Sequence, residues 1–187
     1  MKVLIISGTP KTEGLSCSCV NAVYEGLVDA GSSVELIRIS DEKLSNCVMC
    51  DEGWGDCLKL HTCRFGDDGF TSIQNKIAEA NAVAIVTPVY WGDMSEAMKG
   101  FFDKFRRCEA TRGDEGALAG KSVLLVVSPG GSGNGMISCL EQLERLCHHL
   151  HAKIFDYIGV NRWNREYKLK SIKAASKAMA SSIKINE

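Results

Sequence analysis

The most constraining feature of this sequence is an apolar run at 82–86, Ala-Val-Ala-Ile-Val, which leads directly into Thr87-Pro88-Val89-Tyr90-Trp91-Gly92-Asp93-Met94-Ser95. The run predicts a strand buried on both faces of a parallel sheet. Large apolar residues then recur at three- and four-residue spacing, which predicts an amphipathic helix. These residues are Met94, Met98, Phe101, Phe102 and Phe105. Open α/β sheets bind ligands where such strands end. Two aromatic side chains beside a glycine suit a flat ligand, and a tight turn covering the core is the alternative.

Other apolar runs predict strands at 2–6, 33–39, 123–127 and 154–160, and periodic segments predict helices at about 16–30, 70–77, 136–149 and 167–183. Strands that alternate with helices favour an α/β fold with a parallel, doubly wound sheet. Five strands fit the flavodoxin-like three-layer sandwich, with strand order 2-1-3-4-5. We expect one flavodoxin-like domain over 1–187, with a cysteine-rich insert at about 40–68.

Composition narrows the class of protein. Apolar residues make up 45% and charged residues 24% of the chain, as in ordinary globular proteins. A formal net charge of −1 without a basic stripe argues against a nucleic-acid partner. No apolar run approaches the ~18 residues of a membrane span, and the run at 3–6 is too short for a signal peptide. We therefore expect a cytoplasmic protein that binds neither nucleic acid nor membrane.

The segment 7–16 predicts an anion site, because it opens a helix directly after a strand and leaves backbone N–H groups unpaired. Its donors and flexible positions are Gly8, Thr9, Lys11, Thr12, Gly14 and Ser16, with Lys11 as its only cation. Neither a Walker loop nor a G-x-G-x-x-G fingerprint is present, which favours a phosphomonoester. A plain capping loop with Ser16 as N-cap is the alternative.

Three loops, 7–16, 88–94 and 128–133, are expected at the same edge of the sheet. The first suits a phosphate and the second a flat ring. The third is rich in glycine and can offer backbone N–H groups to the polar edge of a ring. Together these properties indicate FMN.

The same loops resemble those of the NADPH-dependent FMN reductase family. The family's phosphate loop, G-S-P-R-x-x-G-N-T, is similar to the segment that contains Gly8-Thr9-Pro10-Lys11, Gly14 and Ser16. This chain departs from that motif at Leu15, where the family usually has Asn. Thr87–Ser95 resembles its S-P-V-Y-W/F-G segment, and Pro129-Gly130-Gly131-Ser132-Gly133 its second flavin loop. The resemblance covers nearly the whole chain.

This resemblance implies roles at matching positions. The phosphate would be held by Thr9, Lys11, Gly14 and Ser16, with Cys17 as a further candidate that is otherwise a small buried residue. The ring would be framed by Pro88, Val89, Tyr90, Trp91 and Gly92 and, on its other edge, by Ser128, Gly130, Gly131 and Gly133. No side chain needs to act as a catalytic acid or base, since the flavin carries the chemistry. The resemblance also implies that NAD(P)H is the transient electron donor and that a small molecule or a protein is the electron acceptor. It implies a homodimer or homotetramer as the assembly.

Nine cysteines are many for a chain of this kind, and four form the motif Cys47-x2-Cys50-x6-Cys57-x5-Cys63. The motif resembles the C-x2-C-x2-C-x4–7-C motif of iron–sulfur flavoproteins, which binds a [4Fe–4S] cluster. Thiolates suit such a cluster, tetrahedral zinc accepts the same ligands, and an empty loop that shields the flavin is the third alternative.

The expected function is an FMN-dependent oxidoreductase that passes electrons from NAD(P)H through FMN to an acceptor. One alternative is an electron carrier of the iron–sulfur flavoprotein type, and another is an interaction module without a cofactor. The histidines at 148, 149 and 151 are expected to be structural, at a helix end. Trp163 is expected to cover either the flavin or a subunit interface.

Overall fold

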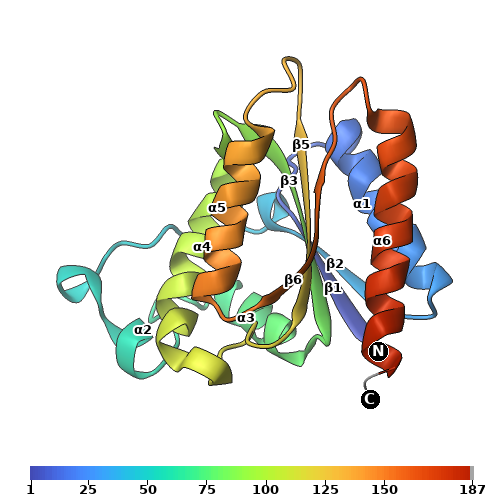
Figure 1. Ribbon diagram of the computed structural model, residues 1–187. Helices are drawn as coiled ribbons and strands as arrows, with labels where there is room; N and C mark the ends of the chain where they lie inside the picture. Colours follow the sequence, from blue (N-terminus) through green and yellow to red (C-terminus); the bar gives the residue numbers. More distant parts are fainter. Residues whose placement is uncertain (186–187) are drawn as a thin grey trace.

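The computed structural model describes residues 1–185, and it is an α/β sandwich of three layers (Figure 1). Its parallel strands are β1 (Lys2–Ser7), β2 (Ser33–Arg38), β3 (Ala82–Tyr90), β5 (Ser122–Pro129) and β6 (Lys153–Gly159). They lie in the order β2-β1-β3-β5-β6, which confirms the predicted flavodoxin-like order. The labels differ from the prediction because β4 (Asp93–Met94) is a short antiparallel partner of β3. Residues 186–187 of the predicted domain lie outside the described part.

Helices cover both faces of the sheet. Figure 1 shows α1 (Leu15–Asp29) and α6 (Arg165–Ile185) on one face, and α3 (Phe70–Glu79), α4 (Glu96–Glu109) and α5 (Met136–His149) on the other. The predicted helices lie within a few residues of these bounds. No helix among residues 1–185 combines the length and the apolar character that crossing a membrane requires.

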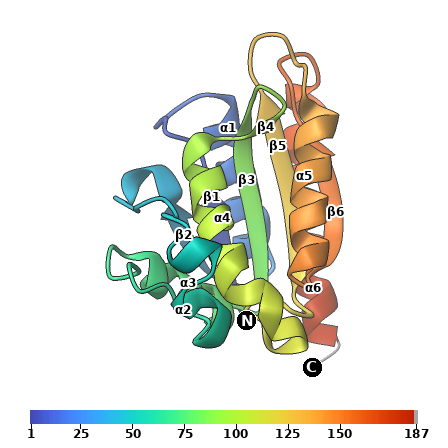
Figure 2. The ribbon, with the colours of Figure 1, turned by 90° about the vertical axis from the view of Figure 1, so that its left-hand side faces the viewer.

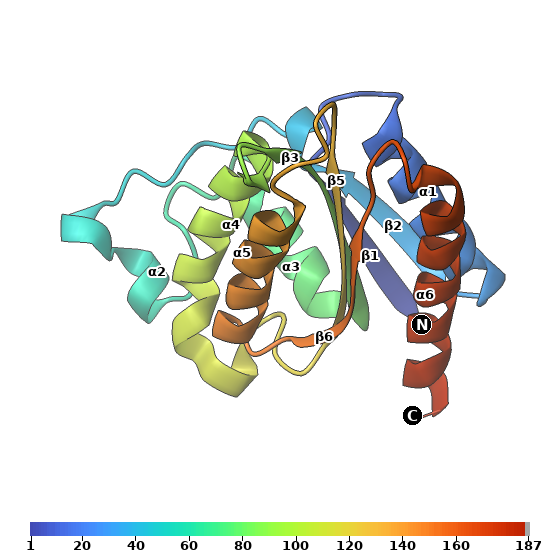
Figure 3. The same cartoon turned by 45° about the horizontal axis from the view of Figure 1, so that its top comes forward.

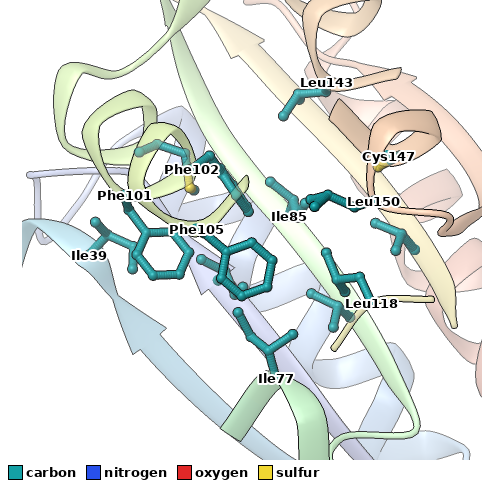
Figure 4. Packing of buried hydrophobic residues seen from close by; sticks show 14 of the residues in the cluster. Ile39, Ile77, Ile85, Phe101, Phe102, Phe105, Leu118, Leu143, Cys147 and Leu150 are labelled. Atoms are coloured by element: carbon teal, nitrogen blue, oxygen red, sulfur yellow. The ribbon is translucent and has the colours of Figure 1, made fainter. Parts of the chain in front are cut away.

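The core is divided by the sheet into two layers. Successive residues of β3 alternate between them: Val83 and Ile85 face α4, whereas Ala82, Ala84 and Val86 face α1 and α6. This alternation confirms a strand buried on both faces. On the α4 side the phenylalanines at 101, 102 and 105 pack around Ile77, Ile85 and Leu118 (Figure 4). Burying each such side chain contributes roughly 1.5–3 kcal/mol.

The stretch after residue 86 is a hairpin, where the sequence predicted only a strand-to-helix loop. Strand β3 continues to Tyr90 and pairs with β4. Positive φ at Trp91 (52°) and Gly92 (81°) is the signature of a type I′ turn. Pro88 has no N–H donor, yet it is tolerated inside β3. Gly8 N–H donates to Val86 O, so the backbone polar groups of residues 86 and 88 point toward β1. Because β1 has ended at Ser7, no hydrogen bond to that strand is lost at Pro88.

The cysteine-rich segment runs along the outside of α4 and carries little regular structure (Figures 1 and 3). It contains the 3₁₀ turns η1 (Ile39–Asp41) and η2 (Asp51–Gly53) and one short helix, α2 (Asp56–Lys59). A further 3₁₀ segment, η3 (Ala110–Glu115), follows α4. The absence of a clear hydrophobic period at 40–68 therefore reflects a true loop.

Candidate functional site

The loops after β1, β3 and β5 lie at one edge of the sheet, at the top of Figure 2. The first of them, between β1 and α1, is held by neighbouring elements. The Ser40 hydroxyl donates to Thr9 O at 2.9 Å, and the Cys17 thiol donates to Lys11 O at 3.1 Å. Arg38 Nη1 donates to the same Lys11 carbonyl at 3.3 Å. Cys17 therefore holds the shape of the loop, while the Lys11 side chain is exposed.

The amino terminus of α1 is open to an anion. Gly14 is its N-cap, with φ of 106°, and among residues 1–185 no side chain caps this end. No acidic residue lies in the first turn either. The unpaired N–H groups and the helix dipole thus favour a negative ligand. Ser16 is not the N-cap that a plain capping loop would require.

Buried hydroxyl groups tie the three loops together. Ser16 Oγ and Ser128 Oγ lie 2.7 Å apart and join the start of α1 to the end of β5. The Ser95 hydroxyl donates to Gly8 O at 2.7 Å, and Ser95 N–H donates to Thr87 Oγ1 at 3.1 Å. These bonds fix the predicted phosphate loop, residues 7–16, relative to both loops that follow β3 and β5.

The second and third loops enclose a cleft of about 720 Å³. Its lining residues are Val89, Tyr90, Trp91, Gly92, Pro129, Gly130, Gly131, Ser132, Asn134, Gly135 and Ser138. Trp91 is fully exposed at the tip of the hairpin, in a left-handed conformation that a bulky residue rarely adopts. Such strain is typical of functional sites.

The cleft fits a flat ring with polar edges. No described atom lies within 4 Å of where a Cβ would sit at Gly130 or Gly131, and neither residue has a positive φ. The protein's own packing and backbone therefore do not require glycine at these positions. Both glycines therefore leave the backbone open to the close approach of a ligand.

The structure places the predicted ring residues in three different surroundings. Val89, Tyr90, Trp91 and Gly92 line the cleft together with Gly130 and Gly131, whereas Pro88 and Ser128 are buried in β3 and β5 beneath it. Gly133 faces the ring of Trp163, since a Cβ there would lie 2.7 Å from Trp163 Cζ3.

Sequence reasoning missed two groups of residues at this edge. Gly135 and Ser138 also line the cleft, and the Gly-x-Gly spacing at 133–135 was the available signal for the first. Arg38 contacts the phosphate loop, and Arg165 contacts Ser18 in the first turn of α1. No sequence signal pointed to either arginine, because they come from β2 and α6.

The four predicted cluster ligands gather beside α4. Cys47, Cys50, Cys57 and Cys63 line one small cavity of about 20 Å³, together with Cys108 of α4. Burial, with smaller contributions from Cys57 and Cys63, raises the pKa of the Cys108 thiol to about 12. Within residues 1–185, no three His, Cys, Asp or Glu side chains are arranged to hold a metal ion. The arrangement therefore does not itself fit a cluster or zinc.

A buried lysine anchors both ends of this cysteine loop. The Lys104 side chain is only 2% exposed, and its Nζ donates to Ser45 Oγ (3.1 Å), Phe65 O (3.0 Å) and Asp68 Oδ2 (3.1 Å). Burial alone would raise the pKa of Asp68, but hydrogen bonds from Ser45, Phe70 N–H and Lys104 outweigh it and lower the pKa to about 2. Asp68 is thus a carboxylate at neutral pH, paired with Lys104.

Two arginines hold the middle of the loop. Arg64 bridges Asp51 (2.6 Å) and Asp56 (2.9 Å), while Arg107 of α4 donates to Gly53 O and lies over the Trp54 ring at 5.2 Å. Polar and cation–π contacts therefore order a segment that buries little apolar surface.

The parallel sheet and the three loops at its carboxyl edge define a flavodoxin-like protein. The sequence model of the NADPH-dependent FMN reductase family matches residues 1–162, so the chain belongs to that family of flavin-dependent oxidoreductases. The family's cofactor, FMN, agrees with the open α1 terminus and the cleft described above.

The relatives include several iron–sulfur flavoproteins. One from Methanosarcina thermophila is 30% identical over 169 residues, which cover 88% of this chain and 83% of the relative. One from Methanocaldococcus jannaschii is 31% identical over 106 residues, or 57% of this chain and 52% of the relative. The chain spans about half the length of this relative and of one from Archaeoglobus fulgidus, at 52% and 45%.

Solved structures share the fold. An NAD(P)H:quinone oxidoreductase from Methanothermobacter marburgensis superposes with a TM-score of 0.75 at 18% identity, covering 96% of both chains. An archaeal flavodoxin superposes with a TM-score of 0.65 at 16% identity, covering 98% of this chain and 99% of the other. At these identities the likeness shows the fold alone.

Proposed function

We propose that this chain is an FMN-dependent oxidoreductase that takes electrons from NAD(P)H and passes them to a small-molecule or protein acceptor. The observation that carries the proposal is the pairing of an uncapped helix terminus at Gly14 with a cleft of about 720 Å³ along the same sheet edge. The first suits a phosphate and the second a flat ring.

The chain's own residues bind and orient the cofactor. The N–H groups at the start of α1 and the Lys11 ammonium would hold the phosphate. Tyr90 and Trp91 would frame the ring, and the backbone N–H groups of Gly130 and Gly131 would donate to its polar edge. Bound FMN supplies the redox chemistry itself. Because Trp91 stands fully exposed at the rim, the outer side of the cleft is open to a transient donor.

Rapid mixing of the FMN-loaded protein with NADPH or NADH tests the donor. We expect flavin absorbance to bleach faster than in a mixture of free FMN and the same nucleotide. Bleaching at the rate of that free mixture would contradict NAD(P)H as the donor.

A second candidate function is an electron carrier of the iron–sulfur flavoprotein type. Two observations favour it: four cysteines line one cavity, and the relatives carry that name. Because the cysteines do not form a metal site as they stand, a cluster requires the glycine-containing loop at 50–57 to rearrange. Anaerobic purification followed by iron and acid-labile sulfide assays tests this candidate, and less than about one iron per chain would exclude it.

A cofactor-free interaction module remains the third candidate function. Family membership and the open glycines at 130–131 support FMN over it. Excess FMN is expected to raise the melting temperature, because a ligand that binds the native state stabilises it. A colourless protein with no such shift would instead support the module.

We further propose that the chain works as a homodimer or homotetramer. The cysteine loop exposes large apolar side chains, with Val48 and Met49 each 63% and Leu60 67% exposed, and such surfaces are typical of interfaces. Light scattering coupled to size exclusion measures the assembly. A monomer at micromolar concentration would contradict this proposal.

A further inference from the structure

The phosphate loop is short of positive charge. Between Gly8 and Gly14 it carries one cation, Lys11, and one anion, Glu13, so its side chains sum to zero. A phosphomonoester carries about −1.5 to −2 charge at pH 7. The dipole of α1 offsets roughly half a charge. Positive charge from outside the loop would therefore strengthen the binding of a phosphate.

We propose that Arg38 and Arg165, from β2 and α6, supply this charge and are binding residues for the phosphate of FMN. The inference rests on the proposed function, since it takes FMN as the ligand. Neither arginine belongs to the phosphate-loop motif, and they lie 127 positions apart in the sequence.

Arg38 reaches the loop because of strand register. It is the last residue of β2, and its partner in β1 is Ser7, the residue at which the loop begins. Its side chain is half-buried, and Nη1 donates to Lys11 O at 3.3 Å. This bond uses one of five guanidinium N–H groups, so donors remain for an anion.

Arg165 reaches the first turn of α1 from a distant part of the sequence. It is the first residue of α6, and Nη2 donates to Ser18 Oγ at 2.8 Å. The Ser18 hydroxyl in turn donates to Gly14 O, the N-cap carbonyl of α1, at 3.0 Å. One side chain, Ser18, therefore separates the guanidinium from the Gly14 carbonyl, which places the guanidinium beside the first turn of α1.

Neither arginine is neutralised by a carboxylate. Among residues 1–185, no ion pair within 4.0 Å involves Lys11, Arg38 or Arg165, whereas cations such as Arg64 and Lys104 are paired. Three cations without a carboxylate partner thus belong to the phosphate loop or contact that loop and the first turn of α1. Arginine binds phosphate well because its planar donors match the phosphate oxygens.

Comparison of FMN with riboflavin tests the assignment, because riboflavin keeps the ring and lacks the phosphate. The full-length apoprotein is titrated with each flavin, as wild type and as Arg38→Gln, Arg165→Gln and the double variant. Arg145→Gln on α5, where the arginine pairs with Glu141, removes the same charge away from the loop as a control. Glutamine keeps a donor and removes the charge.

We expect each single variant to raise the Kd for FMN about tenfold, the scale of a charge-assisted hydrogen bond, and the double variant to raise it further. The Kd for riboflavin and both Kd values of Arg145→Gln should change less than about twofold. Added salt should weaken FMN binding in the wild type and less so in the double variant.

Equal losses of affinity for FMN and riboflavin would show a structural role and overturn the inference. Unchanged FMN affinity in both single variants and in the double variant would overturn it too. In either case a wild type that binds FMN leaves the proposed function standing. A wild type that binds no FMN would overturn both.

Discussion

The backbone of Gly135 lies directly against that of Gly92. A Cβ added at Gly135 would sit 2.8 Å from Gly92 Cα and 3.0 Å from Gly92 N. Both residues have positive φ, 78° and 81°. This contact joins the hairpin after β3 to the loop after β5, and it closes the inner side of the cleft. The two loops can meet there only because Gly135 has no side chain.

Replacing Gly135 by alanine should therefore damage both fold and site. An alanine at position 135 would have to keep the positive φ of the glycine, which costs about 1 kcal/mol or more. Its Cβ would also clash with the backbone of Gly92. Gly120→Ala is a matched control, because its φ is 71° and nothing lies within 4 Å of the added Cβ. Urea unfolding should show a loss at least about twice that of the control, and only Gly135→Ala should weaken FMN binding. Equal losses of stability would contradict the contact.

Alanine at Gly130 or Gly131 should separate binding from stability. The added Cβ meets no atom of the chain, so the free energy of unfolding should change by less than about 0.5 kcal/mol. The same methyl group would project to where the ring edge is expected, and FMN affinity should fall about tenfold or more. Unchanged affinity in both variants would place the ring elsewhere.

Trp91→Asn should raise stability and lower function. Asparagine before glycine is the preferred type I′ turn, and it tolerates the φ of 52° that strains tryptophan, so we expect about 1 kcal/mol of added stability. FMN binding should weaken because the exposed indole is lost. His151→Asn relieves a similar φ of 56° away from the cleft and serves as the control. It should leave FMN affinity unchanged, and a Trp91→Asn variant with full affinity would show that the indole has no part in binding.

Lys104→Met should loosen the cysteine loop. The substitution leaves Asp68 without its buried partner, which costs about 3–5 kcal/mol for such pairs. Lys99→Met on the same helix breaks the exposed pair with Asp103, whose side chains are 41% and 38% exposed, and should cost less than about 1 kcal/mol. Denaturant unfolding measures the difference in stability between the two variants. Faster labelling of the loop cysteines by a thiol reagent in Lys104→Met would show that the cysteine loop is the part that has loosened. Similar costs in both variants would argue against the anchoring role of Lys104.

Asp68 should contribute a pH-dependent part of stability. Its pKa in the folded protein is lowered to about 2, below the ~3.9 of an unfolded chain. A lowered pKa stabilises the folded state above the unfolded value, and the effect is lost as pH falls through the folded one. The stability difference between wild type and Asp68→Asn should thus be constant above pH ~5 and shrink between pH ~4 and ~2. Asp114→Asn, at a side chain 98% exposed, is the control. A difference that does not vary with pH would contradict the charge pairing.

The order of elements followed from local patterns. The apolar run at 82–86 and the aligned phenylalanines of α4 each satisfy one period along the chain, so burial of β3 on both faces and the register of α4 could be predicted. The glycine-rich loop at 130–131 was predicted at the edge of the sheet, and it lines the cleft there, while its contact with a ligand stays a prediction. The hairpin at 91–92 was missed, since tryptophan is a poor type I′ residue and local propensity argued against it.

The sequence by itself therefore determined the sheet, its helices and three loops that suit a phosphate, a ring and a ring edge. Only the tertiary structure decided which other residues meet at those loops. The parallel register of β2 and β1 places Arg38 at the phosphate loop, and the packing of α6 on α1 places Arg165 beside the first turn of α1. The fold of the cysteine loop places Cys108 beside the other four thiols. These contacts join residues far apart in the chain, and no local period or motif encodes them.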